Sequence, residues 1–342
     1  MTWATPQYSR SQVNRAGDVL IADLRSPNDE DWALQVINNW RASHSFPLNT
    51  FQMGLRTRAR QVDSSALIAQ RVKRLSSIEY KLRIQPGMRL SRMQDIGGCR
   101  AVVADVPAVR NLRDLYVKSH LKHRLVKEDD YISEPKRSGY RSVHRVYRYV
   151  SDRSATYNTL QIEVQMRSQL QHAWATAVET VGTFLQQSLK ASQGSDEWLR
   201  FFTLMGSAVA RLENTTLVPD TPTSRSELIR DLKHYITCLD VHGKLSAYSA
   251  TIRTLEKPEV RGAHYFLLDL RPSEGTVTIN TFARNELQVA TAQYLETERQ
   301  LTGPGSEAVL VSVESLGLLR RAYPNYFLDT GVFLDTVKRA VA

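Results

Sequence analysis

Residues 159–167 read TLQIEVQMR, and residues 98–104 read GCRAVVA. In the first stretch every second residue is apolar, which predicts a strand with one face in the core and one polar face. The second stretch is a short valine-rich run of the kind found in buried strands, and residues 140–150 (YRSVHRVYRYV) predict a third strand. The polar face of the first strand carries Gln161, Glu163, Gln165 and Arg167.

Helical patterns surround these strands. Residues 28–42 open with capping and acidic residues and then space their apolar residues as a helix does, up to a predicted break at Pro47. A long helix is predicted over 62–84, and two more over 169–190 and 196–213. Strands alternating with helices predict an α/β class, in the form of a mixed α+β sheet flanked by helices.

The chain beyond about residue 250 has its own pattern. LEKPEVRG supplies Pro and Gly there, and FLLDLRPSEGTVTINTF (266–282) predicts two strands around a turn. A helix over 285–300, a strand over 308–313 and a terminal helix complete this part. We therefore predict a first domain over residues 1–255 and a smaller C-terminal α+β domain over residues 256–342.

Composition restricts the class of protein. The 342 residues carry a net charge of +10, and 42% are hydrophobic, which excludes wholesale disorder and favours polyanionic partners. From residue 56 to 100, eleven basic residues face three acidic ones, whereas from 256 to the end nine basic residues face eleven acidic ones. The two cysteines lie in no disulfide or zinc pattern, and the apolar runs are too short to span a bilayer. A cytoplasmic protein without membrane association is expected.

Basic residues of the predicted 62–84 helix could bind phosphates. Lys73, Ser77 and Lys81 recur every four residues, so a helix would place them on one face, with Arg71 nearby. An ordinary solvated basic face would show the same pattern.

Two carboxylates could hold a metal ion beside those phosphates. Asp95 precedes a predicted strand and Glu163 lies on the polar face of another. Mg²⁺ prefers oxygen ligands and often takes only one or two carboxylates together with phosphate oxygens. Either residue could equally be a surface acid paired with a nearby arginine.

An aromatic residue opens the 140–150 strand. Tyr140 offers a flat face on which a base could stack, with Lys136, Arg141 and His144 around it. A tyrosine packed at the start of a strand would be the structural alternative.

Together, four segments carry a resemblance that none of them carries alone: RVKRLSSIEYK (71–81), RMQDIGGCR (92–100), PKRSGYRSVH (135–144) and IEVQMRSQLQHAW (162–174). They resemble the synthetase domain of the RelA/SpoT family over about residues 30–215. The resemblance implies transfer of the β,γ-pyrophosphate of ATP to a ribose 3′-hydroxyl with Mg²⁺. By motif, it implies that Arg71, Lys73, Ser77 and Lys81 bind ATP, that Asp95 and Glu163 are catalytic and hold Mg²⁺, and that Tyr140, Lys136, Arg141, His144, Gln165 and Arg167 bind the acceptor.

Two acceptors remain open: GDP or GTP, and the 3′-terminal adenosine of tRNA. No His-Asp pair of the family's hydrolase occurs in the sequence. The C-terminal YPNYFLDT, with Tyr323 and Tyr326, resembles the fused antitoxin region of the CapRel group of toxic small synthetases, and PLNTF (47–51) is similar to that group too. This resemblance implies a tRNA pyrophosphokinase that its own C-terminal region inhibits and a phage capsid protein releases. A non-catalytic nucleic-acid-binding module is the other class, and it would need neither Asp95 nor Glu163.

Overall fold

The computed structural model describes residues 3–24, 26–188, 195–251, 253–256, 263–301, 303, 305–313 and 315–342. Its strands form one sheet of nine in the order β3-β4-β5-β2-β1-β9-β7-β8-β6. Their bounds are β1 (Leu67–Val72), β2 (Gly97–Val103), β3 (Arg124–Asp130), β4 (Val143–Arg148), β5 (Gln161–Ser168), β6 (Arg253–Glu256), β7 (Ala263–Arg271), β8 (Thr276–Ala283) and β9 (Glu307–Ser312). The mixed α/β class is confirmed.

Helices surround this sheet on both faces. The α-helices are α1 (Arg10–Ile21), α2 (Pro27–Ser43), α3 (Ser45–Val62), α4 (Leu75–Ile84), α5 (Val106–Lys118), α6 (Gln169–Ser188), α7 (Ser195–Leu212), α8 (Arg225–Cys238), α9 (Val241–Thr251), α10 (Leu287–Arg299), α11 (Leu316–Ala322) and α12 (Gly331–Val341). The described residues also include the 3-10 turns η1 (Leu90–Arg92), η3 (Pro272–Glu274) and η4 (Pro324–Phe327).

The sheet crosses the predicted domain boundary without a break. β2 pairs with β5 in parallel and with β1 in antiparallel orientation. On its other edge β1 pairs with β9, where Gln70 lies opposite Ser312 and Arg71 opposite Val311. The C-terminal strands therefore extend the N-terminal sheet, although the division at residue 256 itself remains a prediction.

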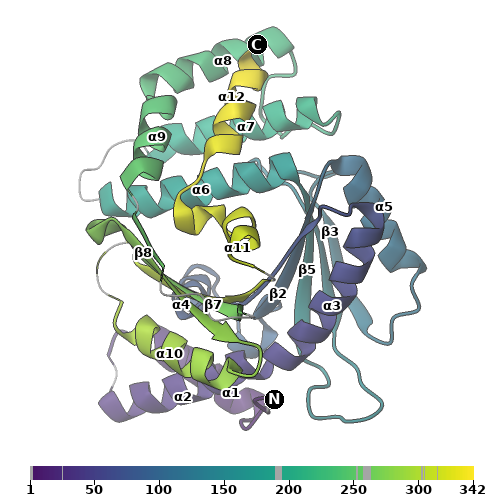
Figure 1. Ribbon diagram of the computed structural model, residues 1–342, viewed down its shortest axis with the longest axis vertical. Coiled ribbons are helices and arrows are strands. Elements are labelled where there is room, and N and C mark those ends of the chain that lie inside the picture. Colours follow the sequence, from purple (N-terminus) through teal and green to yellow (C-terminus); the bar gives the residue numbers. More distant parts are fainter. Residues whose placement is uncertain are drawn as a thin grey trace.

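The sheet bends into two arms, and the tyrosine segment (residues 316–328, comprising α11 and η4) lies between them (Figure 1). We call this side the inner face. There, the tyrosine segment packs on β7, β8 and β9, while α6 runs across the opening. On the outer face α3 and α5 cover the strands from β4 to β1, and α10 covers β7 and β8. Apolar burial on both faces stabilises the sheet.

A helical layer lies above the inner face (Figure 1). α12, the last helix of the chain, packs on α6, α7 and α8 through Phe333 and Val337. Since both ends of the tyrosine segment continue into packed elements, β9 before it and α12 after it, this segment is tethered at two points.

The long helix predicted over 62–84 is wrong. A helix ends at Val62, β1 occupies Leu67–Val72, and a second helix starts at Leu75. β1 is flanked by β2 and β9 and is largely covered on both faces, so its apolar residues show no alternation and imitate a helical stripe. The predicted break at Pro47 is wrong as well: Pro47 lies in the first turn of α3, where its missing N–H is not needed.

The other predicted elements are confirmed within a few residues. They correspond to α2, β2, β4, β5, α6 and α7 in the first part, and to β7, β8, α10, β9 and α12 in the second. The 140–150 strand is shorter than predicted, since β4 begins at Val143. In the described part of the chain, no helix combines the length and hydropathy of a membrane span.

Candidate active site

A cavity of about 90 Å³ opens on the inner face where β1, β2 and β5 meet α6 and the tyrosine segment. Half of the predicted site residues line it, and a groove of about 550 Å³ along α4 shares Lys73 with it. Ser77 and Lys81 line that groove. The cavity is lined by Ala69, Gln70, Arg71, Lys73, Asp95, Gly98, Cys99, Arg100, Glu163, Gln165, Arg167, Glu179 and Tyr323.

Asp95 joins the cavity to the α4 groove. Its carboxylate oxygens accept hydrogen bonds from Lys73 Nζ at 2.7 Å and from Lys81 Nζ at 3.0 Å. Burial would raise the pKa of Asp95, but the two ammonium groups outweigh it and hold the pKa below its ordinary value. Asp95 is therefore ionised, and both lysines are oriented toward the cavity.

Five side chains, which come from β4, from β5 and from the loop before β4, form a closed ring of hydrogen bonds. Glu163 Oε1 lies 2.7 Å from His144 Nδ1, and His144 Nε2 lies 2.6 Å from the Tyr140 hydroxyl. Arg167 donates to that hydroxyl at 2.7 Å and to Gln165 Oε1 at 3.1 Å, and Gln165 Nε2 donates to Glu163 Oε2 at 2.7 Å. The alternating pattern of β5 and its pairing with β4 create this ring.

The ring fixes the charge of Glu163. Burial alone would raise the pKa of this carboxyl group, but the hydrogen bond and charge of His144 and the hydrogen bond from Gln165 hold its pKa below the ordinary value. A buried carboxylate with an adjacent imidazole is a suitable acceptor for a proton from a hydroxyl group.

Two of the predicted acceptor residues, Lys136 and Arg141, lie outside this ring. Lys136 Nζ lies 5.4 Å from the Tyr140 ring centroid and 4.3 Å from that of Tyr131, so it remains beside the predicted stacking face. Arg141 is not brought to the cavity: its guanidinium donates to the carbonyls of Ile132 and Thr216 and to the Thr215 hydroxyl. Its contacts tie the loop before β4 to the end of α7, so the structure gives Arg141 a structural position.

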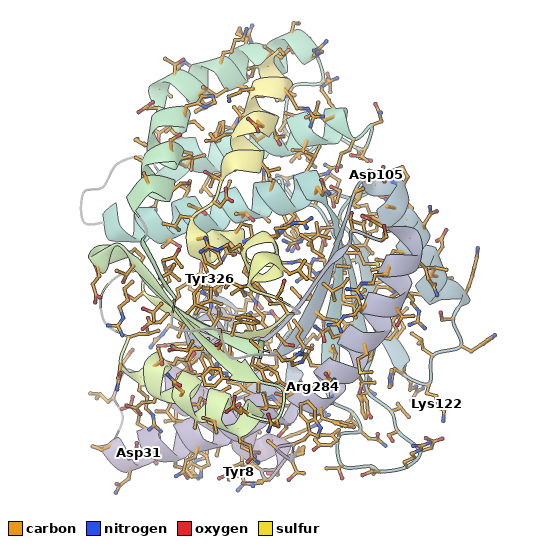
Figure 2. The ribbon with its side chains drawn as sticks, viewed as in Figure 1. Tyr8, Asp31, Asp105, Lys122, Arg284 and Tyr326 are labelled. Carbon is orange, nitrogen blue, oxygen red and sulfur yellow. The ribbon has the colours of Figure 1, made fainter. Side chains whose placement is uncertain are left out.

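The tyrosine segment closes the cavity. Tyr323 is 3% exposed, donates from its hydroxyl to the Gln70 carbonyl at 2.9 Å, and has the Arg100 guanidinium 5.7 Å from its ring centroid. Arg100 also donates to the Ala322 carbonyl at 2.7 Å. Tyr326 lies at the centre of the molecule (Figure 2), and Arg74 donates to its hydroxyl at 3.2 Å. Both tyrosines thus contact the elements that carry the predicted ATP residues.

Beneath the tyrosine segment, basic side chains lie close together, and some of their nitrogens have no hydrogen-bond partner among the described residues. Burial, together with the charge of Arg167, lowers the pKa of Arg100 to about 10. Buried nitrogens of Arg100 and Arg167 and His172 Nδ1 have no hydrogen-bond partner among the described residues. Orphaned donors of this kind indicate a site for a polyanion.

Two residues that line the cavity, Arg100 and Glu179, were missed at the sequence level, and so was His172, which lies near Arg100 and Arg167. Arg100 lies in the quoted RMQDIGGCR, where alternation along β2 could have placed it on the same face as Gly98. Glu179 and His172 lie on α6, whose contact with the sheet depends on tertiary packing and left no local signal.

Comparison with known proteins identifies the segment that carries this site. Residues 70–182 match the family model described as "Region found in RelA / SpoT proteins". The GTP pyrophosphokinase YjbM of Bacillus subtilis is 32% identical over 111 residues, which are 32% of this chain and 52% of that protein. GTP pyrophosphokinase YwaC of the same organism is 30% identical over 112 residues, 31% of this chain and 52% of that protein. The chain spans about half the length of the curated relatives it matches.

Solved structures that align with this chain have lower sequence identity to it. Small alarmone synthetase 1 from Bacillus subtilis, bound to its product pppGpp, aligns with a TM-score of 0.43 and 21% identity, over 54% of this chain and 94% of that one. Small alarmone synthetase 2 of the same organism aligns with a TM-score of 0.43 and 22% identity, over 54% of this chain and 95% of that one.

Proposed function

We propose that this protein is a pyrophosphokinase that transfers the β,γ-pyrophosphate of ATP to a ribose 3′-hydroxyl. The supporting observation is that Arg71, Lys73, Asp95 and Glu163 line one cavity inside the RelA/SpoT region. Pyrophosphoryl transfer depends mostly on in-line positioning and on neutralising phosphate charge. A cluster of buried cations beside an ionised carboxylate supplies both.

Each group has a role in this proposal. Arg71 lies in the cavity with Lys73, and Ser77 and Lys81 continue the donors along the adjoining groove, so a triphosphate would cross from one to the other. Glu163 accepts or orients the proton of the attacking hydroxyl, while Tyr140, supported by His144 and Arg167, offers its ring to the acceptor's base.

Mg²⁺ fits the site only together with phosphates. Asp95 and Glu163 contribute carboxylates to the same cavity, and within the described residues no third acid, His or Cys joins them in a metal-binding cluster. One or two carboxylates plus phosphate oxygens are a usual Mg²⁺ ligand set. Asp95 and Glu163 would hold the ion, which would neutralise phosphate charge.

For the acceptor we propose the 3′-terminal adenosine of tRNA, which would make the protein an inhibitor of translation. The support is the C-terminal resemblance to the CapRel group. GDP or GTP is the second candidate, favoured by the names of the two relatives as GTP pyrophosphokinases. The basic surplus of the chain suits either polyanion.

We further propose that the described state is inhibited and that a phage capsid protein releases it, as part of an antiviral defence. A cavity of about 90 Å³ is small beside the roughly 300–1,000 Å³ of small-molecule sites, and Tyr323 lines it, so displacing the tyrosine segment would enlarge the space that ATP shares with the α4 groove. Tyr323 covers Arg100 and lines the cavity together with Arg71.

The test combines release with acceptor choice. The full chain carrying Tyr323→Ala and Tyr326→Ala is incubated with γ-labelled ATP, Mg²⁺ and either GDP, GTP or bulk tRNA. We expect label on tRNA, at a rate at least about tenfold above the unsubstituted chain, and arrest of growth when the variant is expressed. Tyr323→Phe with Tyr326→Phe is the matched control, because it keeps both rings in place and loses only the hydroxyl contacts.

The outcomes separate the candidates. Label on GDP or GTP alone would replace tRNA as acceptor and keep the enzyme class. Label on no acceptor by a folded variant, with the trigger protein also added, would leave the non-catalytic binding module as the better description.

A further inference from the structure

Helix α4, which carries Ser77 and Lys81, starts without a cap of its own. Arg74 occupies the N-cap position and makes no capping hydrogen bond with its side chain, and the first turn holds no acidic residue. The first amide groups of a helix need an acceptor, and a carboxylate is the most favourable one because of the helix dipole.

A carboxylate from the C-terminal part of the chain supplies the missing cap. Glu298 of α10 accepts a hydrogen bond from the Leu75 amide through Oε1 at 3.0 Å. Arg41 of α2 donates to the same carboxylate at 2.8 and 3.2 Å, and the Tyr294 hydroxyl donates to it at 2.7 Å. The side chains of Arg41 and Glu298 are 3% and 11% exposed, so water competes little with these bonds.

The same cluster fixes the backbone of Lys73. Arg41 Nε donates to the Lys73 carbonyl at 2.9 Å, and the Lys73 amide donates to the Ile96 carbonyl, next to Asp95, at 2.8 Å. The backbone of Lys73 is therefore held on both sides.

β9 supports the neighbouring residues. It pairs with β1 opposite Arg71, and its Glu307 forms an ion pair with Arg74. Residues 71–75, which lead from β1 into α4, thus depend on contacts with β9 and α10. Both of these elements belong to the same C-terminal region as the tyrosine segment.

We infer that the C-terminal region has two separable parts, a support (residues 263–312) that shapes the nucleotide site and the tyrosine segment that closes it, with Glu298 as a positioning residue for Lys73 and α4. This inference rests on the proposed function and narrows it: release must displace residues 316–328 while β7, β8, β9 and α10 stay in place. The C-terminal region is then required for catalysis as well as for inhibition.

Activity tests the positioning role in the full chain with Tyr323→Ala and Tyr326→Ala as the parent. Glu298→Ala should lower kcat/KM about tenfold to hundredfold, mainly through a higher KM for ATP, because misplaced phosphate donors are costly. Glu298→Gln should restore part of it, since its amide oxygen can still accept from Leu75. Replacing the ion pair as a whole, Arg41→Met with Glu298→Leu, keeps the packing and should remain folded yet show the same raised KM.

The matched control is Glu79→Gln, which removes an ion pair with Arg83 on the same helix but away from the cap. It should leave KM for ATP within about twofold of the parent. A folded Arg41→Met, Glu298→Leu variant with the parent's KM and kcat would overturn the positioning role.

Hydrogen exchange provides a readout that does not need activity. In the otherwise unsubstituted chain, Glu298→Ala, which removes the acceptor for the Leu75 amide, should accelerate amide exchange in peptides covering residues 73–84, whereas peptides of β2 keep their protection. Unchanged exchange at residues 73–84 would contradict the inference even if the parent were active. An inactive parent with accelerated exchange would instead refute the proposed function and keep the structural role of Glu298.

Discussion

Glu163 shows how one side chain depends on its neighbours. Its two oxygens are bound by different donors, His144 on one side and Gln165 on the other. Both contacts favour the charged form, so the carboxylate is ready to accept a proton without first losing one. The ring continues to Tyr140, which means that the base and the stacking face for the acceptor are held by a single network.

Replacing Glu163 by Gln tests this role. The variant keeps the shape of the side chain but cannot take up a proton, so transfer should fall by about a hundredfold or more in the parent with Tyr323→Ala and Tyr326→Ala. ATP binding, measured by titration calorimetry, should weaken by much less. Glu227→Gln on the exposed surface of α8 is the control and should have no effect. Turnover by Glu163→Gln at the parent's rate would refute the assignment.

At the scale of elements, the strands that carry the ring were predictable and the strand beside them was not. The alternation along residues 159–167 placed Glu163, Gln165 and Arg167 on one face, and β5 has that arrangement. β1 shows no such alternation, because it pairs with β2 on one edge and β9 on the other, and packed elements cover both of its faces. The charged edge strand β3 was also missed, since RLVKEDD has few of the residues typical of strands.

The loop before β4 depends on two glycines that touch. Gly139 adopts φ +92°, and a Cβ added to Gly206 of α7 would lie 2.6 Å from the Gly139 Cα. This close approach places the turn that ends at Tyr140 against α7. Only glycine accommodates such a backbone contact.

Gly206→Ala should therefore shift Tyr140. We expect a loss of about 1–3 kcal/mol in the free energy of unfolding from overpacking. In the parent with Tyr323→Ala and Tyr326→Ala, KM for the acceptor should rise and KM for ATP should change little, because this turn packs on α7, whereas the proposed ATP residues lie on β1, on α4 and between them. Gly182→Ala on α6, where an added Cβ meets nothing within 4 Å, is the matched control. Equal changes in both KM values would show that the turn does not act on the acceptor alone.

At the scale of the whole molecule, one continuous sheet joins the two parts of the chain that differ in charge. The basic first part and the slightly acidic tail suggested two units, but β9 pairs with β1 and α12 packs on α6 and α7. No sequence pattern reports which strand lies next to which over such separations. The acidic tail thus supplies Glu298 and Glu307 to the basic site at close range, while Tyr323 and Tyr326 close it.

Buried histidines make the stability of this assembly sensitive to acid. Burial lowers the pKa of His44, at the junction of α2 and α3, from 6.5 to about 4, and it lowers the pKa of His172 beside Arg100 and Arg167 well below its ordinary value. A base whose pKa is lower in the folded state takes up protons first in the unfolded chain. Stability is therefore complete above about pH 6.5 and is lost as the pH falls from there toward 4.

Urea unfolding at pH 7.5, 6.5, 5.5 and 4.5 measures this loss. Each histidine that protonates only on unfolding contributes a slope of about 1.4 kcal/mol per pH unit, which for His44 amounts to a total on the order of 3 kcal/mol. His44→Asn, whose amide can still donate to the Trp40 carbonyl as Nδ1 does, should flatten the profile between pH 6.5 and 4.5. The exposed His120→Asn should leave it unchanged. An identical slope in the His44→Asn variant would exclude His44 as a source of the acid sensitivity.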